Sequence, residues 1–262
     1  MKKSIVCLVV AVVLAGVGKA RAVVIDYDTT IDYTINGPVE ITEGSNPNPP
    51  TTVEIVEPAD LQDGISVYDS SIVNIRGGTI HSDEDMGLST ADDSTVNIYD
   101  GILTSEVDME IGGSSTLNIY GGTVEDEVQA ADFATVNIYG GYVDDLDGAD
   151  SSLLNIFGGE VHTPNVSGLS VLNVFGGNID SLLALDSGRV YLYGIDFNYP
   201  YGAIPDASGI LTGTLKNGDP INAPFEILFD ASIVLAVPEP STLALLSIGA
   251  VGLLGYTLRR RR

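Results

Sequence analysis

Carboxylates are the side chains of this sequence with the greatest capacity for chemistry, and they occur in short runs between apolar segments. Four such runs are Asp83 to Asp85, Asp92 to Asp93, Glu125 to Glu127 and Asp144 to Asp150. Ca²⁺ prefers several oxygen ligands, so the last run is a weak candidate for a calcium site. Its carboxylates are Asp144, Asp145, Asp147 and Asp150. No segment matches an EF-hand loop or a Gly-Gly-x-Gly-x-Asp repeat, and solvated acidic turns are the alternative interpretation.

Paired carboxylates also serve glycoside hydrolysis, so a secreted carbohydrate-active β-helix enzyme, a polysaccharide lyase or hydrolase, is the alternative function. A lyase needs basic groups to bind uronate carboxylates, and these are few between residues 23 and 237. They are Arg76, Arg189, Lys216, His81 and His162. Both histidines directly follow an aliphatic position, which favours solvated turns. Phosphate loops, nucleophile elbows and zinc spacings are missing from the sequence. We therefore expect no enzyme, and no catalytic or cofactor-binding residue.

The charge of the chain excludes one class of partner. The 262 residues include 36 acidic and 11 basic side chains, for a net charge of −25. Most basic residues lie at the two ends, so residues 23–237 carry 35 acidic against 3 basic groups, a formal charge of −32. Such a surface repels polyanions, and we expect no binding of nucleic acid.

The elements that position these carboxylates come from a repeat. One six-residue motif, aliphatic-Asn-aliphatic followed by three further residues that usually end in Gly-Gly, occurs six times. Its asparagines are Asn74, Asn97, Asn118, Asn137, Asn155 and Asn173, at steps of 23, 21, 19, 18 and 18 residues. A decayed copy runs from Val190 to Gly194. A constant short period is the signature of a solenoid, and a β-sandwich has no reason to repeat the same residues.

Within each copy the aliphatic residues alternate with polar or aromatic ones, which predicts a short strand with one apolar face. A second aliphatic position follows the last glycine, and a third apolar cluster follows that one in several copies. The sequence therefore predicts an all-β fold, a parallel β-helix or solenoid with coils of about 18 to 23 residues and three strands per coil. Equivalent side chains then stack into an asparagine ladder and a second ladder. The second ladder consists of Arg76, Tyr99, Tyr120, Tyr139, Phe157, Phe175 and Tyr193. Structural stacking between coils is the favoured role of these rings, and a platform for carbohydrate is the alternative.

The flanks of the repeat are expected to cover its open strand edges. Residues 23–60, with Val39 to Ile41 and Val53 to Ile55, predict an N-terminal cap of strands, residues 61–195 the solenoid, and residues 196–237 a C-terminal β cap. In that cap, Ile210 to Leu215 and Ile221 to Phe229 read as a hairpin around Asn217-Gly218, because Asn-Gly suits a two-residue turn.

Residues 1–22 predict a secretory signal peptide. Lys2 and Lys3 precede an apolar run, and Ala20 and Ala22 form a small-x-small cleavage pattern around Arg21. The only cysteine, Cys7, lies inside this segment. The mature protein is therefore expected to contain no disulfide and no thiolate site.

Residues 238–262 predict a sorting and anchoring tail. Ser241 to Leu258 is an uncharged apolar stretch, about 27 Å long as a helix and long enough to span a membrane. Four arginines follow and would keep that end cytoplasmic, namely Arg259, Arg260, Arg261 and Arg262. Pro238-Glu239-Pro240, followed at once by this span and the arginines, resembles the PEP-CTERM sorting signal of Gram-negative bacteria.

That resemblance covers only about the last 26 residues and implies where the protein goes. It implies processing by an exosortase-type enzyme, an inner-membrane stage during export, and a cell-surface or extracellular-matrix destination with surface polysaccharide as a possible neighbour. Together with the repeat, it predicts a non-catalytic structural or adhesion protein. The ligand, the handedness of the solenoid and the processing site are left open by the sequence.

Overall fold

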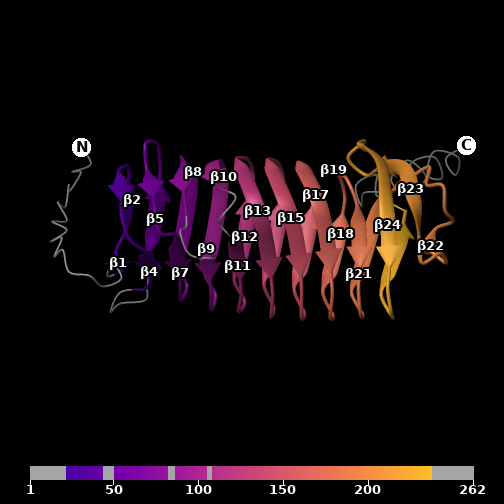
Figure 1. Cartoon of the computed structure of the whole chain (residues 1–262), viewed down its shortest axis with the longest axis horizontal. Helices are drawn as coiled ribbons and strands as arrows, with labels where there is room; N and C mark the ends of the chain where they lie inside the picture. Colours follow the sequence, from indigo (N-terminus) through magenta and orange to yellow (C-terminus); the bar gives the residue numbers. More distant parts are fainter. Residues whose placement is uncertain (1–21, 44–49, 82–85, 105–107, 238–262) are drawn as a thin grey trace, which may run out of the picture.

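The computed structural model describes residues 22–43, 50–81, 86–104 and 108–237. In these ranges the chain contains strands and no helix, and it winds into a parallel β-solenoid (Figure 1). Each coil places short strands on three faces, here named A, B and C in chain order. The predicted all-β parallel solenoid is confirmed.

Face B carries the repeated asparagine motif. Its strands pair in parallel with constant register, so that Asn74 aligns with Asn97 and Asn118 with Asn137. In order along the axis they are β2 (Thr29–Ile31), β5 (Thr52–Ile55), the first part of β8 (Ile72–Ile80) and of β10 (Thr95–Leu103), β12 (Thr116–Ile119), β14 (Thr135–Ile138), β16 (Leu153–Ile156), β18 (Val171–Val174), β21 (Arg189–Ile195) and β25 (Ser232–Ala236).

Face C follows face B in each coil. It contains β3 (Thr34–Ile35), β6 (Asp60–Leu61), the ends of β8 and β10, the first parts of β13 (Thr123–Ala130), β15 (Tyr142–Gly148) and β17 (Glu160–Val166), and β19 (Asn178–Ile179). Face A then closes the coil. It contains β1 (Val23–Ile25), β4 (Val39–Ile41), β7 (Ile65–Val67), β9 (Met86–Thr90), β11 (Asp108–Ile111), the second parts of β13, β15 and β17, β20 (Leu182–Ala184) and β24 (Pro220–Ile227).

Aliphatic side chains fill the interior because alternate residues of every strand point inward. On face B these are the two aliphatics on either side of each asparagine, such as Val136 and Ile138, both fully buried. The aliphatic that follows each glycine pair, such as Val143, faces inward on face C. Neighbouring coils lie about 4.8 Å apart, so each layer of side chains covers the next.

Glycine pairs form the corner between faces B and C because the coils pass too close there for side chains. Gly141 has a φ of 83°, and a Cβ on it would lie 2.8 Å from the carbonyl oxygen of Gly122 in the preceding coil. A Cβ on Gly140 would lie 2.7 Å from the carbonyl oxygen of Tyr120. The Gly-Gly repeat therefore marks a corner at which a Cβ would collide with the preceding coil.

Aspartates form the corner between faces A and B. From the β7–β8 corner onward, each coil places one residue in the left-handed region there, and short polar side chains tolerate it because they bond to nearby backbone. Asp132 Oδ2 accepts a hydrogen bond from the amide of Gly113 at 3.1 Å, and Asp150 Oδ2 accepts one from the amide of Asp132 at 3.3 Å. The residues at this position are Asp69, Asp92, Gly113, Asp132, Asp150, Gly168, Asp186 and Phe229.

The predicted asparagine ladder is confirmed. Asn137 Nδ2 donates to Asn118 Oδ1 at 2.9 Å, and the same bond recurs between each adjacent pair from Asn74 to Asn173 at 2.9 to 3.0 Å. At the N-terminal end, Asn74 Nδ2 donates to Glu54 Oε1 at 2.7 Å. These half-buried side-chain amides therefore satisfy one another's hydrogen-bonding groups along the axis.

The coils extend beyond the predicted boundaries of the solenoid. Strands β1 to β6, within residues 23–60, pair in parallel with later coils instead of crossing the end as a cap. Val53-Glu54-Ile55 holds the place of the asparagine motif, because glutamate offers the same acceptor to Asn74. At the other end, β24 and β25 continue faces A and B, while β22 (Gly202–Ala203) and β23 (Ser208–Leu215) pair antiparallel with this last coil.

The expected hairpin exists, but its turn differs. Strands β23 and β24 pair antiparallel, and Leu215 bonds through its amide to the carbonyl of Asp219 at 2.8 Å, leaving three residues in the loop. Only Gly218 has positive φ, at 102°. The prediction of a two-residue turn is therefore wrong. A three-residue loop needs a positive φ only at its last position, which Gly218 supplies. Asn217 lies in the middle of the loop and donates through Nδ2 to Asp219 Oδ2.

Candidate functional site

The exposed aromatic ladder is the most regular surface feature of face B. Its rings stack at centroid distances of 4.5 to 5.1 Å with interplanar angles of 5° to 12°. The stack runs unbroken from Tyr99 to Tyr193, and the guanidinium of Arg76 lies over Tyr99, 4.2 Å from its centroid. The predicted order of the ladder is confirmed in full.

The geometry of these rings decides what they can bind. A sugar stacks on the face of an aromatic ring, and here each face between Tyr99 and Tyr193 is turned to the next ring. The ladder offers solvent only ring edges and phenol hydroxyls. This arrangement favours stacking between coils over a carbohydrate platform.

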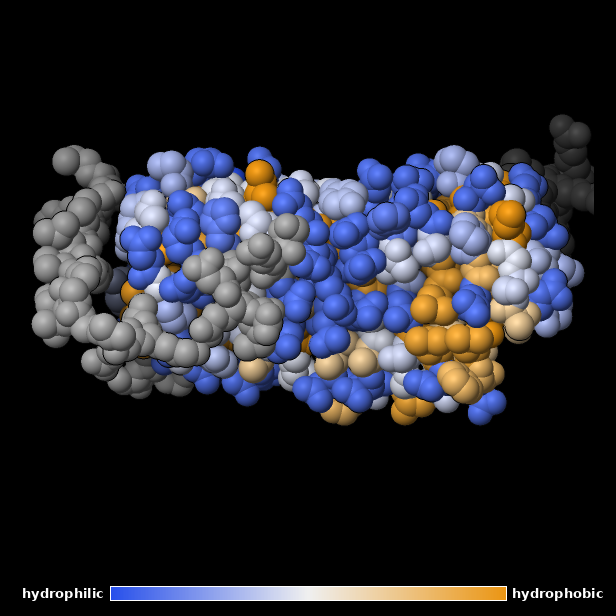
Figure 2. All heavy atoms as spheres, in the orientation of Figure 1, coloured by the Kyte–Doolittle hydropathy of each residue, from blue (hydrophilic) through white to orange (hydrophobic). Residues whose placement is uncertain are grey.

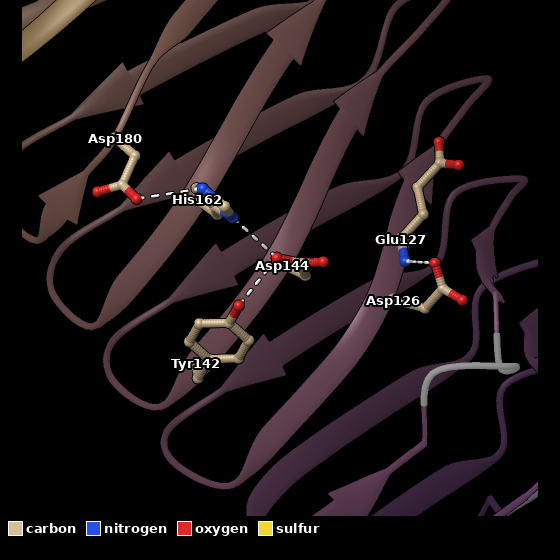
Figure 3. A network of polar contacts seen from close by, with 6 residues as sticks. All are labelled: Asp126, Glu127, Tyr142, Asp144, His162 and Asp180. Atoms are coloured by element: carbon tan, nitrogen blue, oxygen red, sulfur yellow. Dashed lines mark hydrogen bonds and ion pairs between the residues drawn. The ribbon is translucent and has the colours of Figure 1, made fainter.

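A second cluster lies at the corner between faces C and A, where polar side chains of successive coils meet. His162 lies between two carboxylates: its Nδ1 is 3.0 Å from Asp144 Oδ1, and its Nε2 is 3.2 Å from Asp180 Oδ2. Tyr142 donates its hydroxyl to the same oxygen of Asp144 at 2.8 Å. Figure 3 shows the four side chains pointing toward one another along this corner.

This network perturbs the titration of its members. The hydrogen bond that His162 donates to Asp144, followed by the charge of Asp180, raises the pKa of His162 despite some desolvation. The bonds from His162 and Tyr142 lower the pKa of Asp144. With a carboxylate beside each ring nitrogen, both nitrogens of His162 donate at the same time only in the imidazolium form, so these contacts favour the charged ring. The cluster therefore joins three successive coils through their side chains.

Carboxylates also gather on face A beside this corner. Glu127 is half-buried, shares a hydrogen bond with Asp147 across adjacent coils, and faces Asp108 and Asp145 on the strands either side. Burial, then repulsion from Asp147, Asp108 and Asp145, raises the pKa of Glu127 to about 7. Burial also raises the pKa of Asp147. This pair of carboxyl groups therefore keeps a proton to a higher pH than isolated carboxyl groups do.

The structure does not bring the four calcium candidates together. Asp145 and Asp147 point outward from face A, Asp144 is engaged by His162 and Tyr142 at one corner, and Asp150 caps a backbone amide at the opposite corner. Across the described ranges, no three His, Asp or Glu side chains are grouped closely enough to hold a metal ion.

The structure agrees with the expected solvated turns for His81, and for His162 it agrees in exposure but not in secondary structure. His162 is exposed but belongs to strand β17, at its bend from face C to face A. His81 follows β8, and its Nε2 lies 3.3 Å from Asp60 Oδ1. Sequence reasoning missed Asp60 and Asp180 as partners. The signal was available in principle, since both stand about one repeat from their histidine.

The remaining predicted residues lie outside the described ranges, except Ala22. These are Ala20, Pro238, Glu239, Pro240 and the four terminal arginines. The apolar stretch from 241 to 258 also lies outside, and within the described ranges no helix is long and apolar enough to cross a membrane.

Comparison with known families identifies the C-terminal end. Residues 236–262 match the model of the PEP-CTERM protein-sorting motif. This chain carries a PEP-CTERM sorting motif. No curated protein and no solved structure matches the chain. The PEP-CTERM match begins at Ala236, the last residue of β25, so the motif follows the solenoid with only Val237 between that strand and Pro238. The PEP-CTERM signal implies an exported protein that is made as a membrane-anchored precursor and sorted by an exosortase-type enzyme.

Proposed function

We propose that this protein is a non-catalytic structural or adhesion component of the cell surface or extracellular matrix, with an acidic β-solenoid rod as its working part. The observation that carries the proposal is the unbroken pair of ladders, amide and aromatic, in a chain whose end is a PEP-CTERM motif. Uniform coils give a stiff spacer, since each coil repeats the contacts of the last.

The same proposal assigns the two ends. Residues 1–22 act as a signal peptide removed after Ala22, and residues 241–258 form a transmembrane helix with Arg259 to Arg262 in the cytoplasm. The rod is then held outside the inner membrane until the exosortase acts. Surface polysaccharide is the proposed neighbour of the released or anchored rod.

The ladder geometry supports a scaffold over an enzyme. A carbohydrate-active solenoid would need a coil where the ladder breaks and polar groups converge with a free acid or base. His162, the side chain best placed for such a role, has both nitrogens engaged by Asp144 and Asp180.

Cell fractionation tests the proposal. The full chain is compared with a chain lacking residues 238–262 and with a chain whose Pro238, Glu239 and Pro240 are alanine. We expect the full chain at the surface or in the matrix, the truncated chain in the soluble exported fraction, and the alanine variant retained in the inner membrane. An identical distribution of all three would remove the sorting role, and release of reducing ends or unsaturated uronates from polysaccharides would remove the non-catalytic assignment.

A further inference from the structure

Three apolar side chains project from one corner of the rod. Among the described residues the most exposed large hydrophobic side chains are Phe229, Phe133 and Leu169, at 83%, 71% and 67%. All three lie on the corner between faces A and B, in the turns that elsewhere carry aspartate, serine or glycine. Exposed apolar residues gathered on one edge indicate a contact surface.

Their spacing follows the coils. The corner turns stack directly, with the amide of Leu169 bonded to the carbonyl of Asp150 at 2.6 Å and that of Ser151 bonded to the carbonyl of Asp132 at 2.9 Å. Phe133 and Leu169 therefore lie two coils apart. Phe229 lies two coils beyond Leu169, because Val171 pairs with Arg189 in the next coil and Arg189 pairs with Ser232 in the last one. Each step is about 10 Å at the usual spacing of strands. The corner is thus an apolar ridge, here defined as Phe133, Leu169 and Phe229.

The C-terminal end of this ridge is broadened by leucines. Leu228 is exposed beside Phe229, and Leu183 and Leu185 lie half-exposed on the preceding coil. Figure 2 shows apolar atoms gathered in this C-terminal part of a face that is otherwise mostly hydrophilic. The ridge therefore points to a partner met at the C-terminal end of the rod.

Phe229 also departs from the backbone rule of its corner. Its φ is 60°, a conformation costly for a bulky side chain, and the equivalent residue in the other coils is aspartate or glycine. A strained aromatic residue that is 83% exposed gains nothing from burial within the fold. Strain of this kind is typical of functional positions.

We infer that the ridge inserts into the surface of a lipid bilayer while the precursor is anchored, an inference that rests on the proposed membrane tail. Between Ala236 and Ser241 the chain can span at most about 18 Å, so an inserted tail holds the last coil beside the membrane. A convex corner buries little area against a protein, whereas a bilayer interface closes around it. Apolar side chains reach about 5 to 10 Å into that interface.

The charge around the ridge sets which lipid it accepts. Asp132, Asp150 and Asp186 line the same corner, and the rod is strongly acidic. Anionic headgroups repel such a surface, so the ridge inserts into zwitterionic bilayers and is weakened by anionic lipid at low salt.

The sequence contains no tryptophan, so a single introduced tryptophan is a fluorescent probe of its own position. Full-length chains with Phe229→Trp or Leu169→Trp are reconstituted into phosphatidylcholine vesicles with brominated acyl chains. Ile102→Trp, on face C and 45% exposed, is the matched control, and Leu246→Trp reports whether the tail itself is inserted.

We expect a blue-shifted emission and roughly 2-fold or greater quenching by brominated lipid for the probes at 229, 169 and 246, and none at 102. Quenching at 246 without quenching at 229 and 169 would overturn the ridge inference and leave the anchor intact. Lack of quenching at 246 would instead show that the tail is not inserted, and it would remove the anchor on which the proposed function and the ridge inference both depend. A blue shift at 229 that is insensitive to bromine but depends on protein concentration would replace the bilayer with a second copy of the chain.

Discussion

His162 is bonded through Nδ1 to Oδ1 of Asp144, 3.0 Å away on the preceding coil. The bond joins coils outside the backbone ladder, and it is strongest while the imidazole is charged. The stability of this acidic rod is therefore linked to pH through side chains whose positions the coil register sets.

The pH dependence of His162 follows from its raised pKa. A histidine whose pKa is raised in the folded state stabilises the fold below its ordinary value of 6.5, and that contribution is lost as pH rises through the folded value. We expect His162→Gln to lower the melting temperature at pH 5.5 and to have little effect at pH 9. His81→Gln is the control at another coil. A deficit that grows with pH would contradict the assignment.

Glu127 gives a second pH effect of the same sign. Its folded pKa of about 7 lies above the ordinary 4.5, so its protonated form stabilises the fold at low pH and this stability is lost as pH rises from 4.5 to 7. We expect Glu127→Gln to be about 1 kcal/mol more stable than the parent above pH 7, after allowance for solvent screening. Urea unfolding at pH 5 and 8 measures this, with exposed Glu125→Gln as control. Equal gains at both pH values would argue against retention of a proton.

Gly141 tests the close approach of coils. Alanine there meets both a positive φ and backbone atoms of the preceding coil, while alanine at Gly218 meets a positive φ of 102° with nothing within 4 Å. We expect Gly141→Ala to cost about 3 kcal/mol or more and Gly218→Ala about 1 kcal/mol. Chemical unfolding of the two variants separates the steric contribution from the conformational one. Similar losses would show that the corner has room to relax.

The amide ladder should depend on every member. Asn137→Ala removes a donor to Asn118 and the acceptor for Asn155 Nδ2, leaving two half-buried amides short of a partner. We expect a loss of about 1 to 3 kcal/mol by urea unfolding. Exposed Gln129→Ala, on face A, is the control, and it should change stability by less than about 0.5 kcal/mol.

Calcium binding by the four candidate aspartates is expected to be weak, because the fold divides them between two corners and one face. Calorimetric titration of the full chain with Ca²⁺ should give no saturable heat at micromolar concentrations. A defined stoichiometry that is lost in Asp145→Asn but kept in Asp150→Asn would place a site on face A after all.

The coils could be predicted from the repeat because each part of the motif has one physical reason. Val-Asn-Ile places two aliphatic side chains in the interior, and Gly-Gly forms a corner that has no room for a Cβ. Val53-Glu54-Ile55 belongs to the same column, but its sequence does not indicate this, because Glu54 stands in the place of asparagine and no glycine pair follows Ile55. The one-repeat spacing between His162 and Asp180 indicates neighbouring coils, but it does not show that their side chains meet, because the length of the loop at each corner decides that. The position of Phe229 could not be predicted either, because the conformational preference of phenylalanine disfavours a positive φ.

The register between β14 and β16 has one more consequence. Ile138 aligns with Ile156, and Asn137 with Asn155. A deletion of the 18 residues between two aligned positions therefore connects residues that occupy equivalent places in their coils. Gene segments of this length can therefore be gained or lost without disturbing inward and outward positions. The length of the rod therefore changes in steps of about 4.8 Å with the number of repeats that its gene encodes.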